Sequence, residues 1–147
     1  MDEQLEVKVA RTHPDAKLPT RGSEYAAGWD LYALEEVEVP FRQSVKLRLH
    51  VAIPVGYEGQ VRARSSLGSK GLILPHSIGT IDADYRGELF VLMTWLGEGD
   101  SYTVKAGERI AQILISPIPN VSFRVVDFDD LGQTERGEGG FGSTGRF

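Results

Sequence analysis

Apolar residues occupy every second position of the segment Val45-Lys-Leu-Arg-Leu-His-Val-Ala-Ile53. This period of two is typical of a β-strand, because successive side chains of a strand point to opposite faces of the sheet. The intervening positions carry Lys46, Arg48 and His50. The segment is therefore predicted to be a strand with one apolar and one basic face.

Shorter segments of similar character lie on both sides of this strand. Strands are predicted at 5–9, 26–33, 37–41, 60–64, 89–96, 102–105, 109–115 and 121–126, and one helical turn at 66–70. The segment 89–96 is so uniformly apolar that we expect it to be buried on both faces. No apolar period of 3.6 residues is sustained, and glycine and proline separate the strands, so the pattern predicts an all-β barrel or sandwich.

Length and composition limit the possible functions. A chain of 147 residues with 41% hydrophobic and 25% charged residues is expected to form a single globular domain. The absence of cysteine excludes disulfides and thiolate metal sites. A net charge of −5 argues against a nucleic-acid or anionic-membrane surface. With no targeting segment at its N-terminus, the protein is expected to be cytoplasmic.

Two aspartates, a tyrosine and an arginine interrupt the segment Ser77-Ile-Gly-Thr-Ile-Asp-Ala-Asp-Tyr-Arg-Gly-Glu-Leu-Phe-Val-Leu92. The apolar flanks predict two strands that fold back on each other. By itself the polar centre is also typical of a solvated β-turn, where Asp and Gly are common. Three other unusual segments favour the alternative, a functional site within the hairpin.

Guanidinium, hydroxyl, amide and carboxylate groups recur outside this hairpin. Residues 62–68 offer arginines and serines suited to an anion, although they also fit a surface turn with N-capping serines. Gln112 is a polar amide among apolar neighbours, and such a buried amide is more often satisfied by the backbone than by a ligand. Asp30 is a carboxylate within an apolar run.

The composition changes at residue 127, which divides the chain into a barrel domain at 1–126 and a C-terminal arm at 127–147. The arm is rich in glycine and nearly free of aliphatic side chains, so it cannot bury enough surface to order itself. Such ends are commonly dispensable. Here, however, Arg136, Phe141, Ser143 and Thr144 could fold over a ligand that has a planar base and phosphates.

Taken together, five segments resemble the motifs of the homotrimeric deoxyuridine triphosphatases, or dUTP pyrophosphatases. They are Ala27-Gly-Trp-Asp-Leu31, Arg64-Ser-Ser-Leu67, Gly79-Thr-Ile-Asp-Ala-Asp-Tyr-Arg-Gly87, Gly107-Glu-Arg-Ile-Ala-Gln112 and Arg136-Gly-Glu-Gly-Gly-Phe-Gly-Ser-Thr-Gly145. The third and fifth motifs are long and specific. The resemblance extends from about Ala27 to the C-terminus.

This resemblance implies hydrolysis of dUTP to dUMP and pyrophosphate, which limits uracil incorporation into DNA and supplies dUMP for thymidylate synthesis. It also implies an antiparallel jelly-roll-like barrel assembled as a homotrimer, with sites between subunits and exchange of the arms. Asp82 takes the position of the base that activates water. Arg64, Ser65, Ser66 and Gln112 would hold the triphosphate together with Mg²⁺, which Asp30 would reach through water.

The same resemblance implies the contacts of the nucleoside. The main chain of Gly79, Thr80 and Ile81 would read uracil, and the Tyr85 ring would pack under the sugar and exclude a 2′-hydroxyl. Phe141 would stack on the base. Substrate contacts are also expected from His76, where some relatives have asparagine, and from the arm residues Arg136, Gly142, Ser143 and Thr144.

The second motif departs from the family pattern. Arg64-Ser-Ser-Leu-Gly68 resembles instead the related dCTP deaminases, whose pattern implies a glutamate and an arginine where this chain has Leu92 and Ser69. A leucine cannot transfer protons, so deamination is rejected. A β-barrel that binds nucleotides without turnover is the remaining alternative. The water-activating Asp82 and the intact arm weigh against it.

Overall fold

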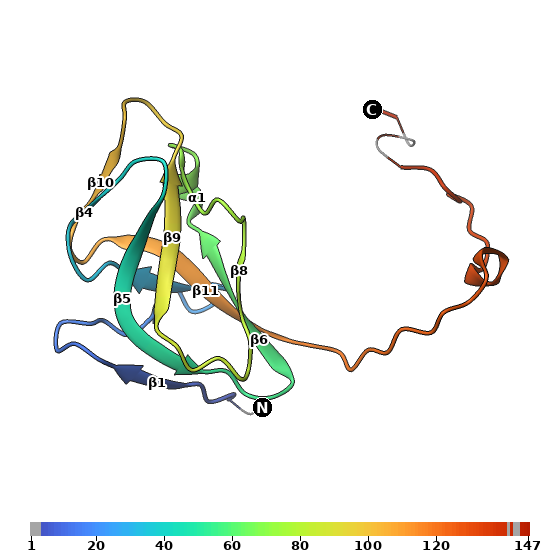
Figure 1. Ribbon diagram of the computed structural model, residues 1–147, viewed down its shortest axis with the longest axis horizontal. Helices are drawn as coiled ribbons and strands as arrows, with labels where there is room; N and C mark the ends of the chain where they lie inside the picture. The colour runs from blue at the N-terminus through green and yellow to red at the C-terminus, as the bar shows by residue number, and fades with distance from the viewer. Residues whose placement is uncertain (1–3, 141, 143–144) are drawn as a thin grey trace.

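The structure is a computed structural model that describes residues 4–140, 142 and 145–147. Two antiparallel sheets form a jelly-roll-like barrel (Figure 1). The first sheet has four strands in the spatial order β1 (Lys8–Arg11), β5 (Gln43–Ala52), β9 (Leu89–Trp95) and β7 (Leu72–Ile73). The second has five in the order β2 (Thr20–Arg21), β3 (Trp29–Tyr32), β11 (Arg109–Pro117), β6 (Tyr57–Ala63) and β8 (Gly79–Ile81). A separate pair joins β4 (Val37–Val39) and β10 (Tyr102–Val104).

Two short helical turns complete the described secondary structure. α1 (Ser65–Gly68) follows β6 directly, and the 3₁₀ turn η1 (Phe128–Leu131) lies beyond the barrel. The helical turn predicted at 66–70 is thus confirmed one to two residues earlier. Among the described residues, no helix is long and apolar enough to cross a membrane.

The core lies between the two sheets, and β5 supplies its centre. Val45, Leu47, Leu49 and Val51 are each 5% exposed or less, while the intervening side chains face outward or are half-buried. The predicted alternation of β5 is therefore confirmed. Burial of such side chains stabilises the fold by about 1.5–3 kcal/mol each relative to exposure.

The predictions for the segments 89–96 and 121–126 were wrong. The segment 89–96 was expected to be buried on both faces, yet Phe90 is 49% exposed, because its side chain lies on the outer face of β9 and borders a cavity. A strand was expected at 121–126, and no strand forms there. Pro117 and Pro119 end β11, and the chain then leaves the barrel (Figure 1), so the alternating apolar residues find no strand to pair with.

Candidate functional site

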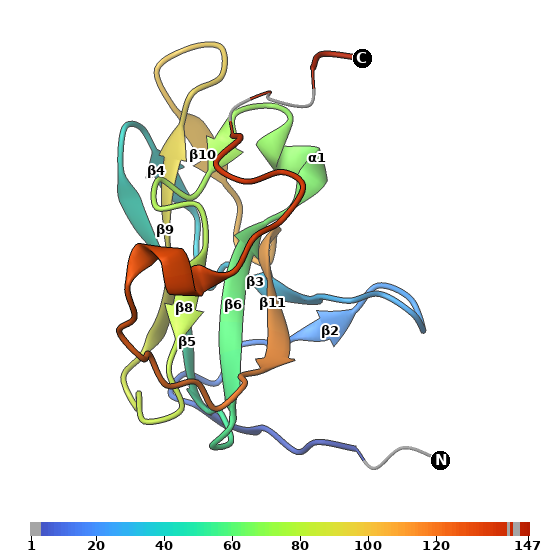
Figure 2. The same ribbon diagram turned by 90° about the vertical axis from the view of Figure 1, so that its right-hand side faces the viewer.

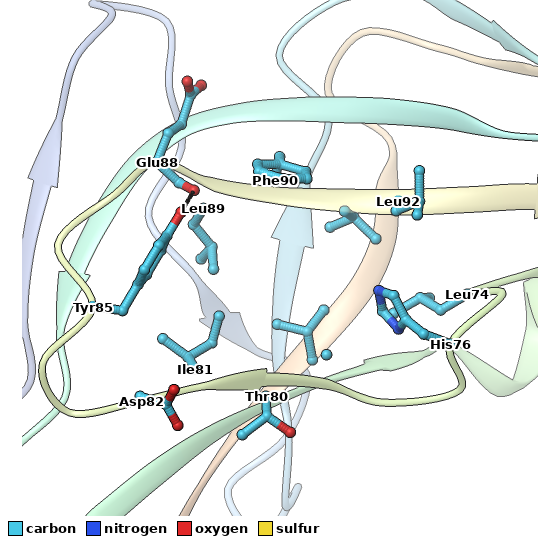
Figure 3. Close-up of a pocket in the computed structure, with 13 residues that line it drawn as sticks. Leu74, His76, Thr80, Ile81, Asp82, Tyr85, Glu88, Leu89, Phe90 and Leu92 are labelled. Carbon is cyan, nitrogen blue, oxygen red and sulfur yellow. Dashed lines mark hydrogen bonds between the residues drawn. The ribbon is translucent and has the colours of Figure 1, made fainter.

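The segment 77–92 borders a cavity of about 210 Å³ (Figure 3). The prediction that the two strands of this segment fold back and pair with each other is wrong, because β8 pairs with β6 and β9 belongs to the other sheet. The cavity therefore opens between the two sheets. The cavity is bounded by side chains of β6, β8, β9 and their loops: Val61, Leu74, His76, Gly79, Thr80, Ile81, Asp82, Tyr85, Glu88, Leu89, Phe90, Val91 and Leu92.

One end of the cavity is aromatic and acidic. Figure 3 shows Tyr85 and Asp82 at this end, with His76 and Leu92 at the other. The Tyr85 hydroxyl donates a hydrogen bond of 2.8 Å to the carbonyl of Glu88. A β-carbon at Gly87 would overlap this hydroxyl, so only glycine there leaves room for the ring. Tyr85 is thus held upright across one end of the cavity.

Asp82 follows the last residue of β8, and its side chain is exposed. Its backbone carbonyl accepts the Tyr85 N–H at 3.1 Å, which closes the turn. Within residues 4–140, 142 and 145–147, its carboxylate makes no hydrogen bond or ion pair. The carboxylate is therefore available to a water molecule at the mouth of the cavity.

A second group of polar side chains gathers where β3, β6 and β11 lie next to each other. The carboxylate of Asp30 lies 3.6 Å from Arg64 Nε and 3.6 Å from a terminal nitrogen of Arg109. Arg64 also donates a hydrogen bond of 3.0 Å to the carbonyl of Arg109. Two guanidinium groups around one carboxylate leave a net positive charge, which suits a polyanion. Asp30, Arg64 and Arg109 are called the basic group below.

Gln112 connects this basic group to the backbone before Arg64. Register places Gln112 opposite both Asp30 and Arg62, and its amide donates a hydrogen bond of 3.1 Å to the carbonyl of Ala63. A β-carbon at Gly28 would overlap the Gln112 side-chain oxygen. The first, second and fourth motifs therefore pack directly on one another. Ser65 and Ser66 lie beside them as exposed residues of α1.

Asp82 at the cavity and the basic group lie at opposite ends of β6. Ile81 pairs with Gly59, so Asp82 lies level with Glu58, six residues before Arg64. At about 3.3 Å per residue this separates Asp82 from Arg64 by roughly 20 Å. Figure 2 shows the same arrangement, with α1 at one end of β6 and the turn after β8 at the other. One chain thus does not bring Asp82 together with Arg64, Ser65, Ser66 and Gln112.

The described part of the arm runs away from its own barrel (Figure 1). Arg136 is exposed and donates a hydrogen bond of 2.6 Å to the carbonyl of Gly139, within the arm itself. Gly142 has a φ of 89°, in the left-handed region. Phe141, Ser143 and Thr144, which were predicted to contact the substrate, lie outside the described residues.

Sequence reasoning missed two contributors to the site. Phe90 lines the cavity from the outer face of β9, and Arg109 shares Asp30 with Arg64. Arg109 stands inside the fourth motif, so the motif itself was the available signal. Phe90 could have been found from the two-residue period of β9, which sets it opposite to the buried Leu89 and Val91.

The residues present do not form a metal cage. Among the described residues, no three acidic or histidine side chains come together, and both oxygens of Asp30 are already paired with arginines. The basic group fits a cation that arrives with phosphates, because Mg²⁺ keeps several waters and uses few protein carboxylates.

Comparison with known proteins identifies close relatives. A family model described as dUTPase matches residues 14–145. The deoxyuridine 5'-triphosphate nucleotidohydrolase of Syntrophotalea carbinolica is 46% identical over 146 residues, which cover 96% of this chain and 97% of the relative. The enzyme of the same name from Candida albicans is 41% identical, covering 95% and 88%.

Solved structures agree with these matches. A dUTPase of Staphylococcus bacteriophage 80alpha with bound dUPNHPP superposes with a TM-score of 0.80 at 28% identity, covering 97% of this chain and 100% of that one. A dUTPase from phage phi11 of S. aureus, described with a structural Mg(II) ion, has a TM-score of 0.76 at 23% identity, covering 86% and 100%. The latter supports the fold alone.

Proposed function

Since this chain belongs to the dUTPase family, we propose that it hydrolyses dUTP with water to dUMP and pyrophosphate. Such a reaction limits uracil incorporation into DNA and supplies dUMP for thymidylate synthesis. The observation that carries the proposal is the 46% identity to a deoxyuridine 5'-triphosphate nucleotidohydrolase over 96% of this chain. The cavity bordered by Asp82 gives this similarity a chemical basis.

The nucleoside is proposed to occupy the cavity of the hairpin. Within the described part of the chain, β8 is an edge strand that pairs only with β6, so the other main-chain edge of Gly79, Thr80 and Ile81 can hydrogen-bond to the uracil edge. The deoxyribose then lies against the Tyr85 ring, and His76 borders the base at the opposite end. The apolar walls formed by Phe90 and Leu92 suit a flat, neutral ring.

Asp82 is proposed to be the base. Its carboxylate accepts a proton from a water molecule whose oxygen attacks the α-phosphorus. The new bond forms between this oxygen and the α-phosphorus, and the bond from that phosphorus to the bridging oxygen breaks. The electron pair leaves with pyrophosphate. No covalent intermediate with the protein is needed.

The basic group is proposed to hold the triphosphate. Arg64 and Arg109 are 30% and 52% exposed at their side chains, so both can turn from Asp30 to phosphate oxygens. Ser65, Ser66 and Gln112 add neutral donors nearby. Such fixed donors stabilise the charge that develops as the bridging bond breaks.

Magnesium is proposed to bind with the triphosphate rather than in a protein cage. When bound, it would neutralise phosphate charge and fix the chain of phosphates in one conformation. Asp30 is the carboxylate nearest to the basic group, and it would contact a water of the ion. The arginines next to Asp30 argue against direct coordination.

A complete site is proposed to need more than one copy of the chain. Asp82 and Arg64 of one chain are separated by roughly 20 Å along β6, too far to act on one phosphate chain. The base of one copy would therefore act on phosphates held by another, as in the homotrimer that the family resemblance implies. The segment before the arm supports this arrangement, because Phe123 and Val125 are 96% and 97% exposed in a single copy.

Arm exchange would also complete the phosphate contacts. The described part of the arm leaves its own barrel (Figure 1), so Arg136, Phe141, Gly142, Ser143 and Thr144 are proposed to close over a site of a neighbouring copy. Closure would exclude water from the reacting phosphates.

Deamination is not proposed. Leu92 lines the cavity at the place where the resembled dCTP deaminases carry a glutamate. The side chain has no group that can transfer a proton.

The direct test measures release of pyrophosphate from dUTP, with UTP and dCTP as competing substrates, and ammonia from dCTP. The wild type is expected to act on dUTP alone, and Asp82→Asn to lose about 100-fold or more in kcat. Asp84→Asn is the matched control, because Asp84 is exposed two residues away and does not line the cavity. Equal rates for Asp82→Asn and the wild type would refute the role of the base, and ammonia release would revive the deaminase.

A further inference from the structure

A bulge in β5 holds Arg48 in an unusual backbone conformation. The pairing of β5 with β9 shifts register between Lys46 and Leu49. Arg48 lies within this bulge with a φ of 57°, and Ser77 is the only other described non-glycine residue with positive φ. Glycine is the residue that normally takes such a position, since a β-carbon is disfavoured there.

Neighbouring loops fix this conformation. The Arg48 carbonyl accepts hydrogen bonds from the Thr12 N–H at 3.0 Å and from the Thr12 hydroxyl at 3.3 Å. The carbonyl of Lys46 accepts the Leu34 N–H at 3.1 Å. Residues that their surroundings hold in such strained conformations cluster at functional sites.

The side chain of Arg48 reaches the turn that closes the cavity. Arg48 Nε lies 3.7 Å from Glu88 Oε1, a buried oxygen that has no hydrogen-bond partner in the described part of the chain. His50, two residues further along β5, has its Nδ1 2.9 Å from the carbonyl of Arg86. Two polar residues of β5 thus contact this turn through Glu88 and Arg86.

Glu88 transmits the contact to the cavity. Its side chain points away from the cavity in Figure 3, while its carbonyl accepts the hydrogen bond from the Tyr85 hydroxyl at 2.8 Å. The same residue is therefore held by Arg48 on one side and holds Tyr85 on the other. Since this hydrogen bond links Glu88 to the ring, and a β-carbon at Gly87 would overlap the Tyr85 hydroxyl, we expect a movement of Glu88 to displace the ring.

We propose that Arg48 is a positioning residue that fixes Tyr85 through Glu88, and that the bulge of β5 thereby sets the discrimination of the cavity against a ribose 2′-hydroxyl. This inference rests on the proposed function, in which the Tyr85 ring packs against the deoxyribose. Arg48 touches no substrate. Its effect is to keep the Tyr85 ring from moving aside to make room for a ribose.

The test compares four variants with the wild type. Arg48→Gly removes the guanidinium and suits the positive φ, so the variant is expected to fold at least as stably as the wild type. Glu88→Gln removes the charge but keeps the carbonyl that binds Tyr85. Arg48→Lys keeps the charge. Glu36→Gln is the matched control, because it breaks the exposed Lys105–Glu36 pair on another part of the surface.

The main measurement is the ratio of kcat/KM for dUTP to kcat/KM for UTP. Arg48→Gly and Glu88→Gln are expected to lower this ratio by about tenfold and to raise the KM for dUTP more than they lower kcat. Arg48→Lys should restore part of the ratio, and Glu36→Gln should leave it unchanged. An unchanged ratio in Arg48→Gly, with dUTP still hydrolysed, would overturn the inference.

A second measurement does not depend on turnover. Hydrogen exchange of the Tyr85 amide, which is bonded to the Asp82 carbonyl, should be faster in Arg48→Gly than in the wild type and Glu36→Gln. Equal exchange would overturn the link between Arg48 and the turn. A wild type that hydrolyses no dUTP would instead refute the proposed function and leave this link to be judged by exchange alone.

Discussion

The contact between Gly28 and Gln112 makes a quantitative prediction possible. A β-carbon at Gly28 would overlap the side-chain oxygen of Gln112 and lie 3.0 Å from its amide carbon, inside normal contact distance. In Gly28→Ala, Gln112 must therefore rotate and give up its 3.1 Å hydrogen bond to the Ala63 carbonyl. That carbonyl directly precedes Arg64, so the basic group loses part of its support.

Two effects contribute to the stability change. The lost hydrogen bond is worth about 1 kcal/mol, and the crowding adds about 1–3 kcal/mol. A loss of about 2–4 kcal/mol lowers the melting temperature of a chain of this size by about 5–15 °C. Displacement of Arg64 and Gln112 from the phosphates is expected to reduce kcat by about 100-fold, the effect typical of losing one positioned donor.

Calorimetry and pyrophosphate release from dUTP measure these two effects. Gly22→Ala is the matched control, because a β-carbon there meets only Asp30 Oδ2 at 3.9 Å, an ordinary contact. The control should keep both the melting temperature and kcat. If Gly28→Ala also keeps both, Gln112 does not support Arg64, and the packing of the three motifs has no consequence for the chemistry.

Two further predictions concern the turn before β11 and the arm. Burial, followed by the hydrogen bond that the Tyr102 hydroxyl donates to Glu108, raises the pKa of Tyr102 to about 12. Because the folded state binds this proton more tightly, the resulting stability is complete below pH of about 10 and is lost as pH rises toward 12. Alkaline unfolding curves of wild type and Tyr102→Phe should therefore converge in this range, and parallel curves would contradict the shift. A chain that ends at Glu138 should keep the melting temperature, since the last described backbone hydrogen bond to the barrel comes from Ile118, which precedes the arm. The same chain should hydrolyse little dUTP. Full turnover would refute closure by the arm, and a chain that ends at Gly145 is the control.

Local patterns predicted the parts of the fold that depend on local rules. The two-residue period identified β5, and the polar centre of the hairpin identified Asp82 and Tyr85 at the cavity. The motifs likewise predicted that Asp30, Arg64 and Gln112 serve one site, and the structure packs them together. Each of these features depends on residues near in sequence or on the family resemblance.

Features that depend on pairing between distant segments could not be predicted from the sequence. The separation of Asp82 from Arg64 follows from the register of β8 on β6, which no local pattern specifies. Arg48 occupies a regular position in an alternating strand, so nothing in the sequence indicated its positive φ. The segment 121–126 has the alternation of a strand but lacks a neighbour in its own chain, and alternation alone does not supply one.

The geometry of β6 connects assembly with catalysis. Val61 of this strand forms part of the cavity wall, and the strand leads directly to Arg64. Under the proposed function, each copy would therefore carry a nucleoside half-site at one end and a phosphate half-site at the other. When the cavity of one copy meets the basic group of the next, the contact joins different surfaces, and it must close into a ring or extend into a filament. A closed ring gives every cavity a basic group and every basic group a cavity. On this reasoning the number of complete sites in a ring equals the number of copies. A single barrel, however stable, would carry one nucleoside half-site and one phosphate half-site but no complete site.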